Sequence, residues 1–174
     1  MPENLCYNLS KKNMLDIAVN NWEIIAKLIF AVVLGGAVGI ERSLAGKTAG
    51  MRTYALVAMG SALFVIIADL VTRQYLALGI RNFDPLRVAS QIVVGIGFLG
   101  AGLIIFKDHK VSGLTTAAGV WVSSGIGMAV GYGLYTLGLF VSILTLLIFT
   151  VFWTLEEKVA GGRAQIRSGH KDEA

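Results

Sequence analysis

Residues 39–53, GIERSLAGKTAGMRT, decide the fold, because they place a short charged segment between two long apolar runs. The runs cover residues 22–40 and 53–71, and each approaches the roughly 20 mainly apolar residues that a helix needs to cross a membrane. Since the segment between them is short, the two runs predict an antiparallel pair of transmembrane helices.

Three further apolar runs follow, over residues 88–106, 114–130 and 134–153. The whole chain of 174 residues is 55% hydrophobic and only 15% charged, a composition that soluble domains rarely have. We therefore expect an all-α integral membrane protein with a bundle of five transmembrane helices. A polar leader (1–21) and a short, mobile, charged tail (154–174) would flank the transmembrane domain (22–153).

A weak direct repeat relates two parts of the chain when the sequence is shifted by 63 residues. Lys47 then aligns with Lys110, and Thr53 with Thr116. Each copy would hold a glycine-rich helix, a basic loop and a second helix, so the bundle would contain two parallel hairpins plus a fifth helix. Chance matching of Gly and Ala in a biased sequence explains the repeat equally well.

Basic residues in the loops predict the orientation, because cytoplasmic loops are enriched in Lys and Arg. With the amino end outside and the carboxyl end in the cytoplasm, nine basic residues lie inside and five outside: Arg42, Lys47, Arg52, Lys107, Lys110, Lys158, Arg163, Arg167 and Lys171 against Lys11, Lys12, Arg73, Arg81 and Arg87. The net charge of +4 is explained by these loops, so we expect membrane lipid and not nucleic acid as a partner.

The charged segment is the first candidate site. It combines Glu41, Arg42, Lys47 and Arg52 with several small residues, which favours backbone folded tightly against other helices. The alternative is simple anchoring by basic side chains at the membrane interface. Thr53 is available as a helix cap. Because Thr115 and Thr116 open the fourth predicted helix at the same level, we expect them to join this cluster. Glu41 should form a charge-assisted hydrogen bond, and Arg52 is the candidate for a specific fork-like pairing that Lys would not replace.

Glycines recur in the predicted spans at spacings that suit close helix contact. We expect the following to serve in packing: Gly35, Gly39, Gly97, Gly100, Gly102 and Gly113. Such faces exceed the needs of five helices, so they also predict a homodimer or a small homo-oligomer.

Asp69 is a carboxylate inside an apolar run, and Gln91 should reach the same outer level. A charge there is costly unless it is paired or hydrated, and Arg73, one turn away, is a candidate partner. The alternative is an Asp–Arg pair that only fixes the helix ends. Asp69 and Glu41 are the candidate ligands for a metal ion whose identity the sequence does not reveal.

The order of the motifs resembles the MgtC/SapB family of bacterial inner-membrane proteins. The similar stretches are GGAVGIERSLAGKTAGMRTYALVAMGSALF (35–64), QIVVGIGFLGAGLI (91–104) and GLTTAAGVWVSSGIGMAVGYGLY (113–135). The resemblance implies the bacterial inner membrane, a role in growth at low Mg²⁺ and in virulence, and regulation of the F-type ATP synthase. Its motifs map onto Glu41, Arg42, Lys47, Arg52, Thr53, Asp69, Gln91, Gly95, Gly97, Gly100, Gly102 and onto residues 113–117. Virulence-type members carry an ACT-like cytoplasmic domain after the last span, and we expect a short form without it.

Three functions fit these observations. The favoured one is a non-enzymatic membrane protein of magnesium homeostasis that modulates a partner such as the F-type ATP synthase. The second is a small Mg²⁺ transporter or channel, and the third is a structural or lipid-interacting scaffold. No combination of nucleophile, base and metal ligands predicts an enzyme, and no cofactor is expected apart from Mg²⁺ as a candidate ligand.

The loop charges make the topology testable. A reporter fused after Ala174 should be active only in its cytoplasmic form, and a reporter placed before Met1 only in its external form. A carboxyl end found outside would reverse the assignment of every loop.

Overall fold

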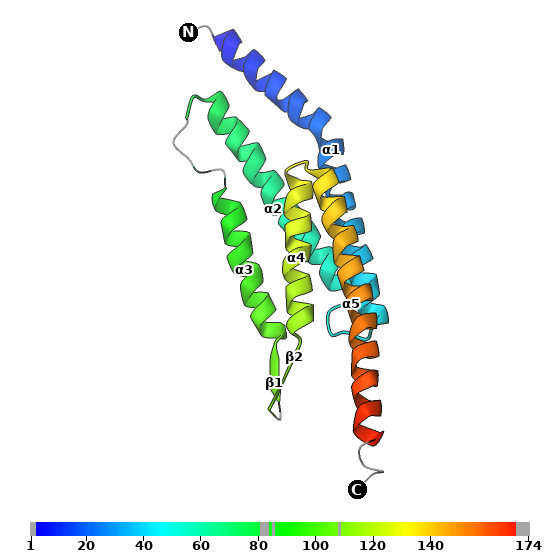
Figure 1. Ribbon diagram of the computed structural model, residues 1–174. Coiled ribbons are helices and arrows are strands. Elements are labelled where there is room, and N and C mark those ends of the chain that lie inside the picture. The colour runs from blue at the N-terminus through cyan, green and yellow to red at the C-terminus, as the bar shows by residue number, and fades with distance from the viewer. Residues whose placement is uncertain (1–2, 81–83, 85, 108, 170–174) are drawn as a thin grey trace.

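In the computed structural model, the backbone is described for residues 3–80, 84, 86–107 and 109–169, and side chains for the part of this range between residues 21 and 155. These described residues form five helices and one small hairpin (Figure 1). In order they are α1 (Glu3–Leu44), α2 (Met51–Ala77), α3 (Arg87–Leu103), β1 (Ile105–Lys107), β2 (Lys110–Ser112), α4 (Leu114–Gly131) and α5 (Tyr135–Gly169).

Four of the helices are long and apolar enough to cross a membrane, over Asn21–Leu44, Met51–Ala77, Leu114–Gly131 and Tyr135–Leu155. This confirms the prediction of an all-α membrane bundle. The remaining helix of the five, α3, is apolar but shorter. With 17 residues, α3 is about 26 Å long, somewhat shorter than the hydrocarbon core of a bilayer.

The predicted third span, 88–106, is wrong at its carboxyl end. The helix stops at Leu103, Ile104 is extended, and the chain enters the antiparallel β1–β2 hairpin, in which Phe106 pairs with Val111. The sequence did not reveal this change because the residues IIF simply continue the apolar run, and a short apolar strand cannot be told from a helix end by periodicity.

The predicted boundaries of the leader and tail do not coincide with breaks in the helices. Helix α1 begins at Glu3 and runs through residue 22, and α5 continues to Gly169, past the predicted end of the last span at 153. Helical continuity therefore gives no boundary at either position.

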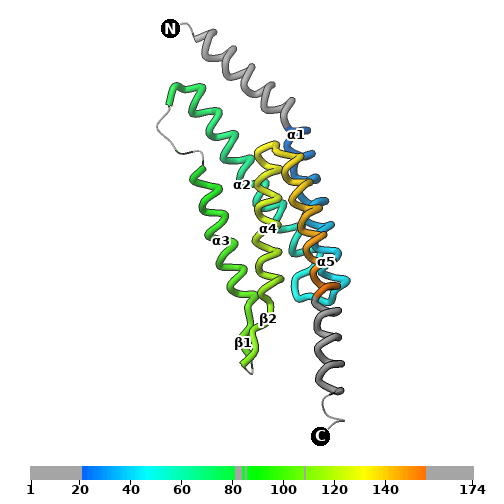
Figure 2. The backbone as a smooth tube through the Cα atoms, in the orientation of Figure 1, coloured from blue at the N-terminus to red at the C-terminus, as the bar shows by residue number. Residues whose placement is uncertain are grey.

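Helix α4 is the centre of the bundle. Of its span, 61% is buried, compared with 22–33% in the other three spans. Helices α1 and α2 lie side by side and both contact α4, while α3 and α5 pack on other sides of it (Figure 2). Two buried hydrogen bonds link α2 to α4: Ser123 Oγ donates to the Tyr54 carbonyl at 2.9 Å, and the Tyr54 hydroxyl donates to the Thr116 carbonyl at 3.4 Å.

Two glycines allow helices α1 and α4 to approach α2 very closely at Ala58. A Cβ added to Gly35 of α1 would lie 2.7 Å from the Ala58 Cβ, and one added to Gly127 of α4 would lie 2.0 Å from the Ala58 carbonyl oxygen. Both distances are far below normal contact, so no other residue fits without moving a helix. In lipid, where helices gain little from the hydrophobic effect, such close packing is a main source of association.

The predicted packing glycines divide into two groups. Gly39 approaches Met51 closely, Gly100 makes an ordinary contact with Ala117, and Gly113 adopts a left-handed turn (φ 88°) before α4. A Cβ at Gly97 or Gly102, however, would meet no atom of the described residues within 4 Å. These two do not pack within the chain, because α3 turns them away from its neighbours.

Replacing Gly35 by Leu should destabilise the bundle by about 1–3 kcal/mol or prevent folding, because the new side chain must displace α2. Replacing Gly97 by Leu is the matched control and should be tolerated. Thermal unfolding of the purified protein in detergent, followed by circular dichroism, would measure both. Equal stability of the two variants would contradict the packing described at Ala58.

Candidate functional site

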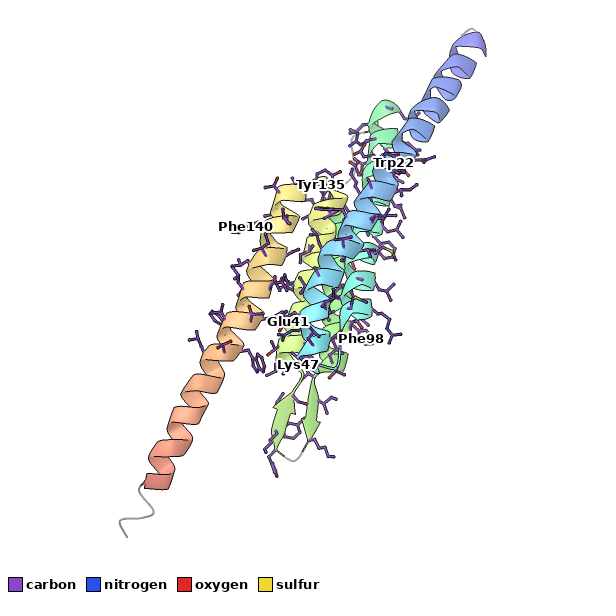
Figure 3. The ribbon with its side chains drawn as sticks, turned by 90° about the vertical axis from the view of Figure 1, so that its right-hand side faces the viewer. Trp22, Glu41, Lys47, Phe98, Tyr135 and Phe140 are labelled. Atoms are coloured by element: carbon purple, nitrogen blue, oxygen red, sulfur yellow. The ribbon has the colours of Figure 1, made fainter. Side chains whose placement is uncertain are left out.

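Most of the predicted cluster lies at one end of the bundle, which we call the hairpin end because it carries β1–β2 and the loop from Ala45 to Gly50. Figure 3 shows Glu41 and Lys47 close to this end, and Trp22 and Tyr135 toward the other. The end of α1 and the loop after it bring Arg42 and Lys47 to a pocket that α5 also lines.

Glu41 and Arg42, at the end of α1, form a fork-like ion pair. Arg42 Nη2 donates to Glu41 Oε1 at 2.6 Å, and Arg42 Nε donates to Oε2. The Arg42 guanidinium also lies 3.7 Å from the centre of the Phe149 ring on α5. Since Arg42 is only 3% exposed, it is held by a carboxylate on one side and an aromatic ring on another.

The expectation that Glu41 has a charge-assisted bond is thus confirmed, but its fork-like partner is Arg42 and not Arg52. Arg52 and Thr53 are exposed on the first turn of α2. Helix α2 turns Met51 and Tyr54 toward Gly39 of α1, so Arg52 faces another side of the helix.

The cap of α2 is also different from the one predicted. Thr53 makes no cap; Gly50 is the N-cap residue and has no side-chain cap bond. Instead the Met51 amide donates to Ser43 Oγ at 3.0 Å, and the same hydroxyl donates to the Gly39 carbonyl at 3.1 Å. Ser43 therefore ties the end of α1 to the start of α2. Sequence reasoning missed it because it lies eight residues before Met51, far from any standard cap position.

A pocket of about 260 Å³ lies beside the Glu41–Arg42 pair. It is lined by Arg42, Ala45, Lys47, Thr115, Ile148, Phe149, Phe152 and Trp153. Thr115 therefore joins the cluster as expected, whereas Thr116 is buried behind it and supplies a backbone carbonyl to Tyr54. The aromatic wall from α5 was not predicted, and the 149, 152, 153 spacing is its only signal in the sequence.

Asp69 and Gln91 lie away from this pocket. Asp69 is 17 residues after Arg52 in α2, about 26 Å along the helix, and accepts a hydrogen bond from Arg73 Nε at 2.9 Å. The pairing of Asp69 with Arg73 is confirmed. Gly131 at the end of α4 packs against Val65 of α2, so Asp69, one turn further along α2, lies near the α4–α5 turn. Burial, and then the Asp69 carboxylate, raises the pKa of Tyr132 in this turn. Gln91 lines a separate groove between α2 and α3.

The candidate metal ligands Asp69 and Glu41 are not part of a larger ligand set. The described residues contain no group of three or more His, Cys, Asp or Glu side chains that could hold a metal ion. Each of the two carboxylates accepts a hydrogen bond from an arginine of its own helix. The arrangement at the hairpin end is therefore cationic and aromatic.

Comparison with known proteins identifies the family. The sequence model of the MgtC family matches residues 28–158, three quarters of the chain. The chain belongs to the MgtC family. This family region contains the Glu41–Arg42 pair, the pocket beside it and the whole of α2, α3 and α4. No solved structure matches the chain.

Relatives of this MgtC family member are similar over part of their length. YhiD of Escherichia coli K12, provisionally named a magnesium transporter, is 47% identical over 133 residues, covering 76% of this chain and 62% of YhiD. SrpB of Synechococcus elongatus is 40% identical over 142 residues, 75% of either chain. MgtC of Brucella abortus is 46% identical over 109 residues, covering 63% of this chain and 42% of that protein. The chain thus spans about three fifths of YhiD.

Removing the carboxylate of Glu41 should be costly for this family member. Glu41→Gln should lower the free energy of unfolding by about 3 kcal/mol, because it leaves the buried Arg42 guanidinium without its counter-ion. The matched control is Asp69→Asn, which breaks the Asp69–Arg73 pair on α2, where the arginine side chain that loses its partner is 69% exposed; there we expect less than about 1 kcal/mol. Unfolding in detergent with increasing dodecyl sulfate would compare them, and equal losses would contradict the role given to Arg42.

Proposed function

We propose that this protein supports magnesium homeostasis by docking a membrane partner at its hairpin end, without carrying the ion and without catalysing a reaction. The provisional naming of the related YhiD as a magnesium transporter supports a link to Mg²⁺. The charge and the aromatic lining of the pocket support the docking of a partner.

The observation that carries the proposal is the charge of the pocket. Lys47 supplies positive charge, since the charge of Arg42 is compensated by Glu41, and Phe149, Phe152 and Trp153 supply an aromatic wall. Mg²⁺ is bound by oxygen ligands, chiefly carboxylates and water, but both oxygens of Glu41 accept hydrogen bonds from Arg42. An acidic or aromatic side chain of another protein fits this pocket better than a divalent cation does.

The resemblance suggests the membrane sector of the F-type ATP synthase as the partner. The pocket lies at the end of the bundle that the loop charges assign to the cytoplasm, next to the last transmembrane helix. A neighbouring membrane protein can reach α5 from the side, since residues such as Phe152 and Trp153 are at least half exposed. Exposed aromatic residues beside a cation are typical of interface centres.

Transport of Mg²⁺ is the competing function, and the name of YhiD favours it. A route through the bundle would have to connect Glu41 at the hairpin end with Asp69 near the α4–α5 turn. Each carboxylate is instead engaged by an arginine, and the groove that contains Gln91 has mainly apolar walls.

Growth at low Mg²⁺ of a strain lacking this protein, complemented with variants, would test the proposal. Lys47→Glu and Trp153→Ala should abolish growth support and the capture of ATP synthase membrane subunits, while membrane levels stay normal. Arg87→Glu, an exposed charge reversal at the other end of α3, is the control and should support growth.

Purified wild-type protein in liposomes should show no Mg²⁺ uptake above empty liposomes. Mg²⁺ flux that Lys47→Glu leaves intact would overturn the docking proposal in favour of transport. Growth support by both pocket variants would overturn the assignment of the pocket.

A further inference from the structure

A second hollow, the α2–α3 groove, lies between helices α2 and α3 and has a volume of about 520 Å³. Helix α3 is held mainly by α4, through contacts such as Gly100 with Ala117, and it stands beside α2 (Figure 1). The groove is lined by Leu56, Val57, Gly60, Ser61, Phe64, Val88, Gln91, Ile92, Gly95, Ile96 and Leu99. Among these lining residues only Ser61 and Gln91 have polar side chains.

Glycines widen the groove on both walls. A Cβ added to Gly60 of α2 or to Gly95 of α3 would meet no atom within 4 Å. Within the part of the chain that the structure describes, these two glycines therefore serve no close contact, unlike Gly35 and Gly127. Because glycine has no side chain, they leave open a groove with apolar walls that larger residues at these positions would fill. A volume of this size is typical of a ligand site.

The length of the groove matches one leaflet of a bilayer. On α3 the lining runs from Val88 to Leu99, about 17 Å along the helix axis. Half of the hydrocarbon core is about 15 Å thick. On α2 the lining runs from Leu56 to Phe64, in the half of that helix nearer the hairpin end, whereas on α3 it begins at Val88, next to the opposite end. Along α2 the groove comes within about 6 Å of Arg52 at the hairpin end. An acyl chain of a phospholipid therefore has the right length and polarity to occupy the groove.

The charges at the two ends of the groove differ. Arg52 is exposed one turn before Leu56 at the hairpin end, and Thr53 lies one turn before Val57. The hairpin that follows α3 adds Lys107 and Lys110. At the opposite end, the positive charge of Arg87 is close in sequence to the negative charge of Asp84. The Asp84 carboxylate accepts a hydrogen bond from the Leu86 amide. The acidic side chain described at the hairpin end, Glu41, is already paired with Arg42 and does not compensate the charge of Arg52.

From this combination we infer that the α2–α3 groove binds one acyl chain of an anionic phospholipid, whose phosphate lies at Arg52. A basic residue at the mouth of a cleft between transmembrane helices is a common way to select an anionic headgroup. The orientation predicted from the loop charges would make this a lipid of the cytoplasmic leaflet. The site gives Arg52 a role other than pairing with Glu41, and it is independent of the pocket beside Phe149.

Native mass spectrometry would test the site, with protein released from nanodiscs of equal parts phosphatidylglycerol and phosphatidylcholine. Wild-type protein should retain one phospholipid, mostly phosphatidylglycerol. Gly95→Leu should lower this retention about tenfold, because a leucine in the groove displaces methylene groups of the chain. Gly97→Leu, at an equally open position of α3 that does not line the groove, should retain lipid like the wild type.

Arg52→Gln should lower the preference for phosphatidylglycerol over phosphatidylcholine about fivefold, and Arg87→Gln should leave it unchanged. Circular dichroism would establish that all variants fold, and Gly60→Leu would replace Gly95→Leu if the latter does not. The proposal would be overturned if a folded groove variant retained as much lipid as the wild type. It would also be overturned if Arg87→Gln lost the preference for phosphatidylglycerol while Arg52→Gln kept it. Loss of a dimer in the groove variant with lipid retention unchanged would assign the groove to a second copy of the chain and also overturn it.

Discussion

Three helices meet at Ala58 of α2 with almost no side-chain volume between them, and the rest of the bundle is arranged around this contact. Gly35 of α1 and Gly127 of α4 bring their backbones directly against it. Within a bilayer, water cannot drive helices together, so dispersion contacts and buried hydrogen bonds must do so. The bond from Ser123 to the Tyr54 carbonyl lies one turn from this contact and fixes the register of α4 on α2.

The close approach at Ala58 determines what the remaining helices can do. Helix α4 is so well enclosed by α1 and α2 that α3 and α5 must pack on what is left of its surface. Helix α5 is then positioned to place Phe149 against Arg42, while α3 stands away from α2 and leaves the groove lined by Gly60 and Gly95. The pocket and the groove are thus two consequences of one central packing arrangement.

The sequence was informative about features set by neighbouring residues. It was uninformative about features that depend on which side of a helix faces another helix. Apolar run length gave the helices, and the i, i+4 spacing of Asp69 and Arg73 gave their ion pair. The run length could not reveal that α3 stops at Leu103, because strand and helix residues are equally apolar there. Nor could it choose between Arg42 and Arg52 as the partner of Glu41, since that depends on which side of α2 faces α1.

Glycine spacing had the same limit. It marked Gly35 and Gly39, which pack, and Gly97 and Gly102, which do not, with the same pattern. Whether a glycine has a neighbour depends on the orientation of the whole helix, and this is set by contacts far away in the chain. The aromatic wall of α5 and the Ser43 hydroxyl were missed for the same reason.

The stacking of Arg42 on Phe149 has a consequence for how the protein is made. The two residues are separated by 107 positions, the difference between their residue numbers, so α1 enters the membrane long before α5 has been synthesised. During that interval the guanidinium has its carboxylate neighbour but lacks its ring and its burial. Insertion of the last helix is then the event that encloses this cation, and a nascent chain stalled before Phe149 would carry an exposed ion pair at the bilayer surface.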